Sequence, residues 1–295
     1  MRIAISGSSG LVGSALAEAL TTGGHEVLRL VRRAPRGAGE IQWNPAEDVI
    51  PADAFRDVDA VVHLAGAGIA DRPWSKDRKK VIWNSRVDGT GVIARAMARG
   101  GPRTLVMASG VGFYGDRADE RLSEDSSRGT GFLAELVEAW EAAAEPARAA
   151  GVRVAAMRLG VVLSPSGGAL AKMLPAFRLG GGAVLGSGAQ YFPWISLRDA
   201  VGAFTRALED DALSGVINTV SPDDVTNREY TKTLAGVLRR PAFLPAPAFA
   251  LRMILGGLAD EALLASQRAV PDRLTAASFP FQDPTLDGCL RAQLT

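Results

Sequence analysis

The sequence contains one cysteine and two histidines among its 295 residues. Cys289 has no second thiol with which to form an internal disulfide, and a lone thiol with His25 and His63, which are well separated along the chain, provides no metal-ligand spacing. These absences exclude a disulfide-stapled fold and predict that the chain holds no metal. They are typical of proteins in the reducing cytoplasm, where we expect this one.

Long apolar runs and an excess of one charge are also missing. No segment reaches the ~18 apolar residues of a membrane span, and the short apolar stretch at the N-terminus lacks the layout of a signal peptide. The 33 Lys and Arg residues balance 32 Asp and Glu, which gives a formal charge of +1. No overall field therefore attracts nucleic acid or an anionic membrane, and we predict neither as a partner. Recognition must be local, and a small-molecule substrate is expected.

Hydrophobic residues make up 47% of the chain, and up to about residue 165 short apolar runs alternate with longer helical ones. This alternation predicts an α/β protein with a doubly wound parallel sheet of the Rossmann type at residues 1–165. Residues 166–295 are expected to form a smaller, mostly helical substrate region, in which 190–220 are candidates for a return to the sheet. The predicted strands are Arg2–Ser6, Glu26–Val31, Ala60–Ala65, Arg103–Ala108, Arg153–Leu159 and Gly215–Val220, and the predicted helices of the first part are Val12–Thr22, Lys79–Ala98 and Phe132–Ala149.

Three glycines spaced three apart stand where the first predicted strand gives way to the first helix. Glycine lets the backbone approach a pyrophosphate, and a helix N-terminus presents free N–H groups and positive partial charge. The alternative is a tight turn without a ligand, but the strand-to-helix context favours dinucleotide binding. The residues predicted to contact the cofactor here are Gly7, Ser8, Gly10, Leu11, Val12 and Gly13.

The second predicted strand ends in Arg32 and Arg33, with no acidic residue at the point where a carboxylate would accept hydrogen bonds from the ribose of NAD. A guanidinium donates two charge-assisted hydrogen bonds to a phosphate and stacks on adenine. We therefore predict NADP as the cofactor. The alternative is that both arginines only solvate the end of a strand.

Together with the glycine spacing, the segments VVHLAG (61–66), NSRVDGT (84–90) and SGVGFYG (109–115) resemble those of an extended short-chain dehydrogenase/reductase. The similarity spans the chain and is greatest to an atypical branch labelled nucleoside-diphosphate-sugar epimerase family. Residues Pro247–Leu294 of this chain resemble the C-terminal end of that branch. The resemblance implies that Leu64 and Ala65 pass under the adenosine side of the cofactor and that Arg86 points toward its phosphates. Without a cofactor, Leu64 and Ala65 would be strand core.

The catalytic pair of that family, a tyrosine followed four residues later by a lysine, is absent. Four residues after the three tyrosines stand Ala118, Ile195 and Leu234. The family's serine is also displaced, because its usual position four residues before the tyrosine of the Tyr-Gly step is Gly110, which leaves Ser109 one place early.

Three side chains are candidates for the missing chemistry. Ser109 is one, and Tyr114 stands on a loop after a strand, where active sites of open parallel sheets gather. Glu135 is a carboxylate in an otherwise apolar stretch, which favours an acid or base role if it faces a pocket. The alternatives are a packed aromatic for Tyr114 and a solvent-facing helix residue for Glu135.

Two functions fit this combination of features. The first is an NADP-dependent oxidoreductase or epimerase that acts on a carbonyl or sugar-type substrate with a substitute proton donor. The second is an NADPH-binding protein that has lost catalysis and signals to a partner.

Overall fold

The computed structural model describes residues 1–242 and 244–295. A seven-stranded sheet has the order β11-β7-β5-β4-β1-β2-β3, and β1 runs parallel to both of its neighbours, β2 and β4. The predicted doubly wound α/β class is confirmed. The strands of this sheet are β1 (Arg2–Ser6), β2 (Glu26–Val31), β3 (Glu40–Gln42), β4 (Ala60–His63), β5 (Thr104–Gly110), β7 (Arg153–Leu159) and β11 (Gly215–Thr219).

The central strands are apolar on both faces because both faces are covered. Ile3, Ile5, Val61 and Val62 have no exposed surface, as expected for a parallel sheet between two helical layers. The chain continues from β1 to β2 on one side, whereas β4 lies on the other side of β1. Such a reversal of strand order opens a crevice at the carboxyl ends of the strands, where ligands of this fold class bind.

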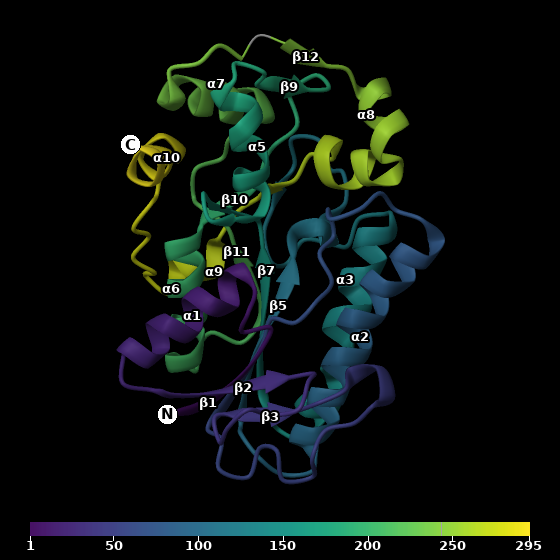
Figure 1. The fold of residues 1–295 in the computed structure, drawn as a ribbon, viewed down its shortest axis with the longest axis vertical. Coiled ribbons are helices and arrows are strands. Elements are labelled where there is room, and N and C mark those ends of the chain that lie inside the picture. The colour runs from purple at the N-terminus through teal and green to yellow at the C-terminus, as the bar shows by residue number, and fades with distance from the viewer. Residues whose placement is uncertain (243) are drawn as a thin grey trace. The chain divides into compact units, whose positions relative to one another are not determined.

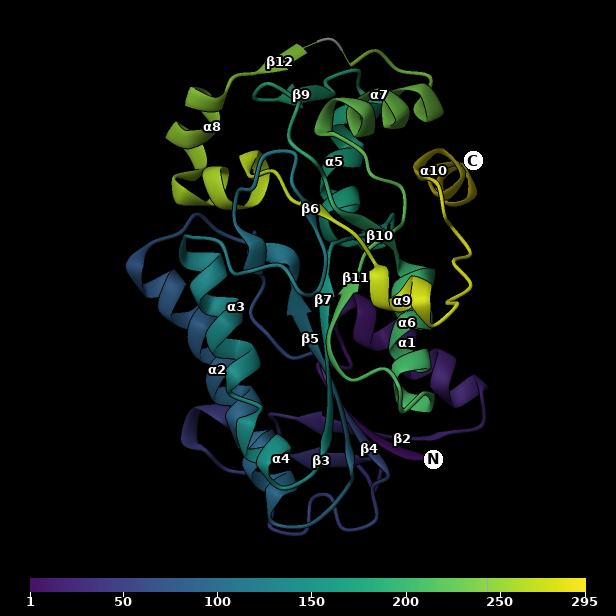
Figure 2. The ribbon, with the colours of Figure 1, turned by 180° about the vertical axis from the view of Figure 1, so that it is seen from behind.

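Helices cover both faces of the sheet (Figures 1 and 2). On one face lie α1 (Leu11–Thr22) and α6 (Leu197–Glu209), and on the other lie α2 (Lys76–Ala98), α3 (Phe132–Ala142) and α4 (Glu145–Ala149). The single helix predicted over Phe132–Ala149 is therefore two. Pro146 occupies the first turn of α4, where its missing N–H costs nothing, but it cannot continue a preceding helix.

The chain divides into two compact units. The first unit comprises Met1–Ser109, Leu136–Met157 and Val201–Ile217, and the second comprises Gly110–Glu135, Arg158–Ala200 and Asn218–Thr295. The units therefore interleave rather than divide at residue 165, and the segment that returns to the first unit, Val201–Ile217, lies within the range 190–220 named as a candidate for such a return. The reason is that the segments following β5 and β7 contribute to the second unit, whereas most of α6 and β11 return to the first.

The second unit has its own core, in which Leu163, Leu174, Trp194, Tyr230 and Leu290 are buried. Its three short sheets pair β10 with β8, β12 with β9 and β13 with β6. The further elements of the chain are η1 (Pro45–Glu47), η2 (Val111–Tyr114), β6 (Arg121–Leu122), β8 (Val161–Ser164), α5 (Gly168–Arg178), β9 (Ala183–Leu185), β10 (Trp194–Ser196), α7 (Asn227–Leu238), β12 (Leu244–Ala246), α8 (Ala248–Leu255), η3 (Ala259–Leu264), β13 (Arg268–Ala269), α9 (Asp272–Ala276) and α10 (Leu286–Leu294).

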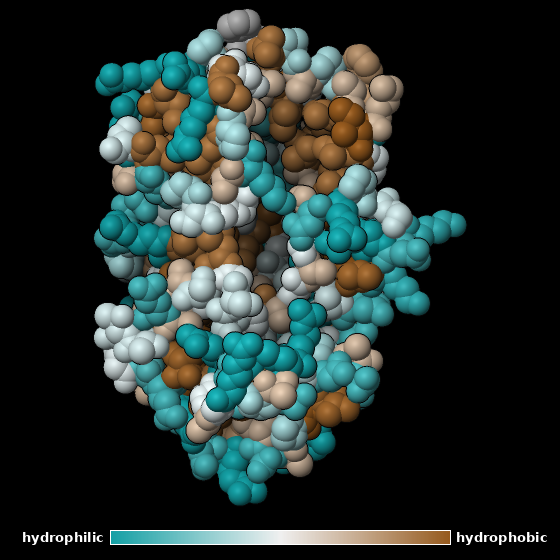
Figure 3. Space-filling view, viewed as in Figure 1, coloured by the Kyte–Doolittle hydropathy of each residue, from teal (hydrophilic) through white to brown (hydrophobic). Residues whose placement is uncertain are grey.

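Among the described residues, no helix combines the length and the apolar character needed to cross a membrane. Exposed apolar side chains are nevertheless concentrated in one place. The space-filling view in Figure 3 shows hydrophobic surface near β9 and α8 of the second unit, and α8 buries none of its residues.

Candidate functional site

The loop between β1 and α1 is closed so tightly that two of its positions require glycine. Gly7 has a φ of 72°, and a Cβ placed there would lie 2.7 Å from the backbone nitrogen of Ala65. A Cβ on Gly13 would lie 2.2 Å from the carbonyl oxygen of Gly7. The loop thus depends on glycine for its own geometry and for its contact with the end of β4.

The N-terminus of α1 has no side-chain cap. Gly10 is the N-cap residue, and no side-chain hydrogen bond caps this end. The first backbone N–H groups of α1 begin at Leu11, and Ser8, Leu11 and Val12 are partly exposed beside them. Free N–H groups and the positive end of the helix dipole form a site for an anion.

A buried pair holds the end of β4 against this loop. Ser6 Oγ lies 2.6 Å from His63 Nδ1 and accepts hydrogen bonds from the backbone N–H groups of Leu64 at 3.2 Å and Ala65 at 3.4 Å. The tautomer of the imidazole sets which of Ser6 Oγ and His63 Nδ1 donates in this hydrogen bond, and Nε2 is buried without a hydrogen-bond partner among the described residues. Burial lowers the pKa of His63 to about 3, so it is neutral.

The two arginines at the end of β2 have different surroundings. Arg33 forms a bidentate ion pair with Glu40 of β3, with hydrogen bonds of 2.5 and 2.7 Å. The hydrogen bonding from Arg33, together with a hydrogen bond from the backbone N–H of Arg36, lowers the pKa of Glu40 to about 2. Arg32 is exposed, and its side chain forms no hydrogen bond or ion pair with any described residue. Arg32 is therefore the one of the two that is free to bind a phosphate.

Arg86 is nearly buried, with 8% of its surface exposed. Its Nη1 donates to the carbonyl oxygens of Ala67 at 2.9 Å and Ile82 at 3.3 Å, and its guanidinium carbon lies 5.1 Å from the centre of the Trp140 ring. No carboxylate within the described chain pairs with it, and burial together with Arg78 lowers its pKa to about 10. Arg86 thus stabilises the loop after Ala65 through its hydrogen bond to Ala67. Its contact with cofactor phosphates stays a prediction.

Ser109 forms a buried pair with Glu141 of α3. Its Oγ donates to Oε1 of Glu141 at 2.5 Å, and the two residues are 4% and 9% exposed. The only proton of the hydroxyl is therefore directed at a carboxylate, so that in this arrangement Ser109 can accept a hydrogen bond but has none to donate.

Tyr114 is fully buried within the second unit. Its hydroxyl lies 2.7 Å from Asn218 Oδ1 and 2.9 Å from the carbonyl oxygen of Ser123, and it accepts a hydrogen bond from Arg158 at 3.1 Å. Burial raises the pKa of Tyr114. These contacts are those of the packed aromatic named as the alternative, because the phenol proton is already shared between internal acceptors.

Glu135 lies in the first turn of α3 and is exposed, which agrees with the alternative of a solvent-facing helix residue. A different carboxylate reaches the start of this helix. Glu261 of η3 accepts a hydrogen bond from the backbone N–H of Leu133 at 2.7 Å, so the C-terminal region caps the start of α3.

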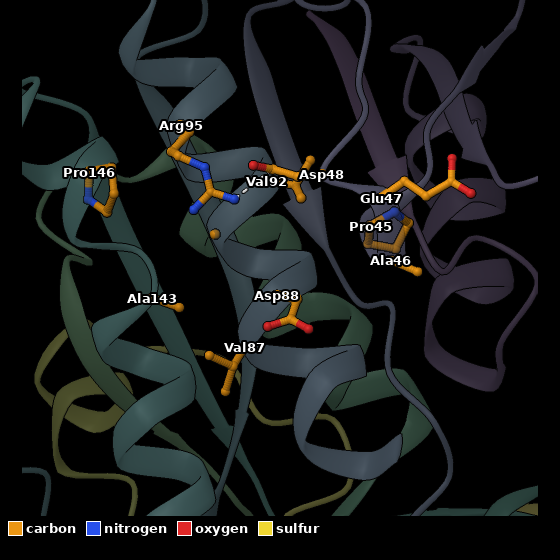
Figure 4. A pocket seen from close by; sticks show the side chains of 11 residues that line it. Pro45, Ala46, Glu47, Asp48, Val87, Asp88, Val92, Arg95, Ala143 and Pro146 are labelled. Carbon is orange, nitrogen blue, oxygen red and sulfur yellow. Dashed lines mark hydrogen bonds and ion pairs between the residues drawn. The ribbon is translucent and has the colours of Figure 1, made fainter. Parts of the chain in front are cut away.

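A cavity of about 580 Å³ lies elsewhere in the first unit (Figure 4). It is bounded by η1, α2 and the start of α4, and Arg95 and Asp48 form an ion pair of 2.6 Å at its side. None of the residues predicted for the cofactor or for catalysis lines it, so it is separate from the site described above.

Sequence reasoning missed four residues of this site. Ser6 and His63 belonged to predicted strands, but only their pairing shows that they support Leu64 and Ala65. Glu40 lies on a three-residue edge strand and Glu141 on a helix far along the chain. The polar Ser6 and His63 at the ends of otherwise apolar strands were the one available signal.

Residues 3–219 match the NAD dependent epimerase/dehydratase family, and residues 246–293 match a domain of unknown function. An epimerase family protein of Mycobacterium bovis is 47% identical over 98% of this chain and 96% of its own length.

Two solved structures resemble the whole chain. Human epimerase family protein SDR39U1, crystallised with NADPH, has a TM-score of 0.90 and 34% identity, and each chain covers 99% of the other. A nucleoside-diphosphate sugar epimerase from Corynebacterium glutamicum has a TM-score of 0.83 and 38% identity, over 100% of this chain and 58% of that one.

Proposed function

Because the chain belongs to the NAD dependent epimerase/dehydratase family, as its motifs predicted, we propose that it binds NADP(H) and transfers a hydride between the nicotinamide and a small carbonyl compound or secondary alcohol. The observation that carries the proposal is the uncapped N-terminus of α1 within the glycine loop, with the unpartnered Arg32 at the end of the neighbouring strand β2.

The residues of the loop fit a dinucleotide. A Cβ on Gly7 or Gly13 would collide with backbone, and the uncapped N–H groups of α1 suit a pyrophosphate. The SDR39U1 structure, which contains NADPH, supports the same choice of cofactor. NADP(H), when bound, supplies or accepts the hydride, and this chain's residues bind and orient it.

Arg32 is the residue we expect to distinguish NADP from NAD. Its guanidinium can donate hydrogen bonds to a 2′-phosphate, whereas the guanidinium of Arg33 is already paired with Glu40. A charge-assisted hydrogen bond contributes about 1.5–3 kcal/mol, so the loss of Arg32 costs about tenfold to a hundredfold in affinity for NADPH.

Parallel titrations with NADPH and NADH, read by energy transfer from the five tryptophans, test the cofactor assignment. We expect Arg32→Gln to weaken NADPH and to leave NADH unchanged. Arg33→Gln is the matched control, because Glu40 already pairs with the side chain of Arg33. It should lower NADPH affinity much less than Arg32→Gln does. Equal affinities of the original chain for the two nucleotides would refute the assignment to NADP.

A second candidate function is binding without turnover. The observation that favours it is that the protons of Ser109 and Tyr114 are both directed at internal acceptors, so neither hydroxyl is placed to protonate a substrate. Oxidation of NADPH in step with reduction of a carbonyl compound would support the enzyme. Tight NADPH binding without turnover over sugar nucleotides, aldehydes and ketones, together with a protein partner released by NADPH, would support a sensor.

A further inference from the structure

One end of the second unit combines exposed apolar side chains with positive charge. Phe249, Met253 and Ile254 on α8 are 66%, 81% and 70% exposed, and Leu244 and Leu179 are 47% and 88% exposed. Helical spacing places Phe249 and Met253 on the same side of α8, one turn apart. Apolar side chains that are grouped and this exposed mark an interaction surface.

These side chains come from segments that lie side by side. β9 pairs with β12 so that Ala183 stands opposite Leu244, and a Cβ on Gly180 would lie 3.4 Å from the Cγ atom of Pro241. α8 follows β12 directly (Figure 1). The five side chains thus come from connected segments of the second unit, and we call Leu179, Leu244, Phe249, Met253 and Ile254 together the apolar end.

The segments that build the apolar end contain no acidic residue. Residues 178–185 and 239–255 lack both Asp and Glu and carry Arg178, Arg239, Arg240 and Arg252, while Asp260 and Glu261 follow on η3, which packs against α8. Arg252 pairs with Asp260 at 2.8 Å. Arg178, Arg239 and Arg240 are exposed, and their side chains form no hydrogen bond or ion pair with a described residue. Free positive charge therefore stands near Leu179, because Arg178 precedes it in the chain and Arg239 and Arg240 precede Pro241, which lies against Gly180.

We propose that the apolar end docks reversibly onto the surface of an anionic lipid membrane. Apolar side chains such as Phe249 and Met253 enter the boundary between headgroups and acyl chains, while the three free arginines meet lipid phosphates. A second copy of this chain fits less well, because a two-fold interface would bring the same arginines toward one another. This proposal departs from the prediction, drawn from overall charge, that no membrane is a partner, and the experiment below tests the two against each other.

Sedimentation of the full chain with vesicles tests the proposal. We expect it to sediment with an equal mixture of phosphatidylcholine and phosphatidylglycerol, not with phosphatidylcholine alone, and to be released as salt screens the arginines. Arg239→Gln and Arg240→Gln should each weaken partitioning about fivefold, and Phe249→Ser about tenfold.

Matched controls are available in the first unit. Val81→Ser removes a 50% exposed apolar side chain from α2, and Arg56→Gln removes an exposed arginine; neither should change partitioning. All these positions are exposed, so thermal melting should show folded variants.

Failure to sediment with the anionic vesicles, or equal loss in Phe249→Ser and Val81→Ser, would overturn the proposal. A dimer that Met253→Ser dissociates, without vesicle binding, would assign the surface to a second copy instead. Because the assay contains no nucleotide, its outcome leaves the assignment of NADP(H) untouched.

Discussion

Two loops that follow strands of the same sheet differ in whether their polar groups have partners inside the protein. The glycine loop after β1 leaves the N-terminus of α1 uncapped, with the unpartnered Arg32 directly after the neighbouring strand β2. The loop after β5 contains Tyr114, whose hydroxyl has three internal partners. Free polar groups are costly unless solvent or a ligand meets them, whereas satisfied ones hold a fold together. The contrast favours binding at the first loop and packing at the second.

The largest effect is expected at Gly13. In Gly13→Ala the new Cβ meets the carbonyl oxygen of Gly7 at 2.2 Å, so the loop must shift, which costs about 2–3 kcal/mol in stability. The shift also moves the N–H groups of α1 out of register with the pyrophosphate, so we expect NADPH affinity to fall about a hundredfold. Titration of the folded variant with NADPH measures this loss of affinity. Gly37→Ala, where a Cβ meets nothing within 4 Å, is the control, and equal affinities of the two variants would contradict the tight closure of the loop.

A loss of stability, with NADPH affinity unchanged, is expected from Tyr114→Phe. The variant leaves Asn218 Oδ1 and Arg158 short of a buried partner, which costs about 2 kcal/mol in the free energy of unfolding. The control is Tyr191→Phe, because the hydroxyl of Tyr191 has no hydrogen-bond partner among the described residues. We expect it to change the free energy of unfolding little. Loss of turnover at unchanged stability would instead make Tyr114 catalytic.

The support beneath the glycine loop should weaken in acid. Since the pKa of His63 is lowered from 6.5 to about 3, folding favours its neutral form; the stabilisation is complete above pH 6.5 and is lost as the pH falls from there toward 3. The loss is about 1.4 kcal/mol per pH unit. Urea unfolding at about pH 7.5 and about pH 5.5 should show a smaller difference in His63→Gln than in the original chain. His25→Gln should keep the full difference.

The smallest effect concerns the ion pair beside Arg32. Glu40→Gln removes a carboxylate near the proposed phosphate site and releases Arg33, so NADPH affinity should rise by about threefold, in keeping with the modest energies of exposed pairs. A fall in affinity would mean that Glu40 positions Arg33 for the cofactor, and the distinction between the two arginines would be lost.

Local sequence patterns located much of the fold. The strands Arg2–Ser6, Glu26–Val31 and Arg153–Leu159 match the structure at both ends, because apolar runs depend on neighbouring residues. β3 has three residues and no such pattern. The division of the second half of the chain was also beyond local reasoning, since segments of each unit alternate along the sequence.

The parallel sheet, the glycine loop and the absence of the Tyr-Lys pair could all be predicted without a structure, because each is a property of residue type at fixed spacing. Folding, by contrast, pairs Arg33 while leaving Arg32 free, directs the hydroxyl proton of Ser109 toward Glu141, and surrounds the hydroxyl of Tyr114 with Arg158 and Asn218. Whether a polar group is available to a ligand depends on partners brought together by folding, and the partners of Tyr114 lie 44 and 104 residues away along the chain.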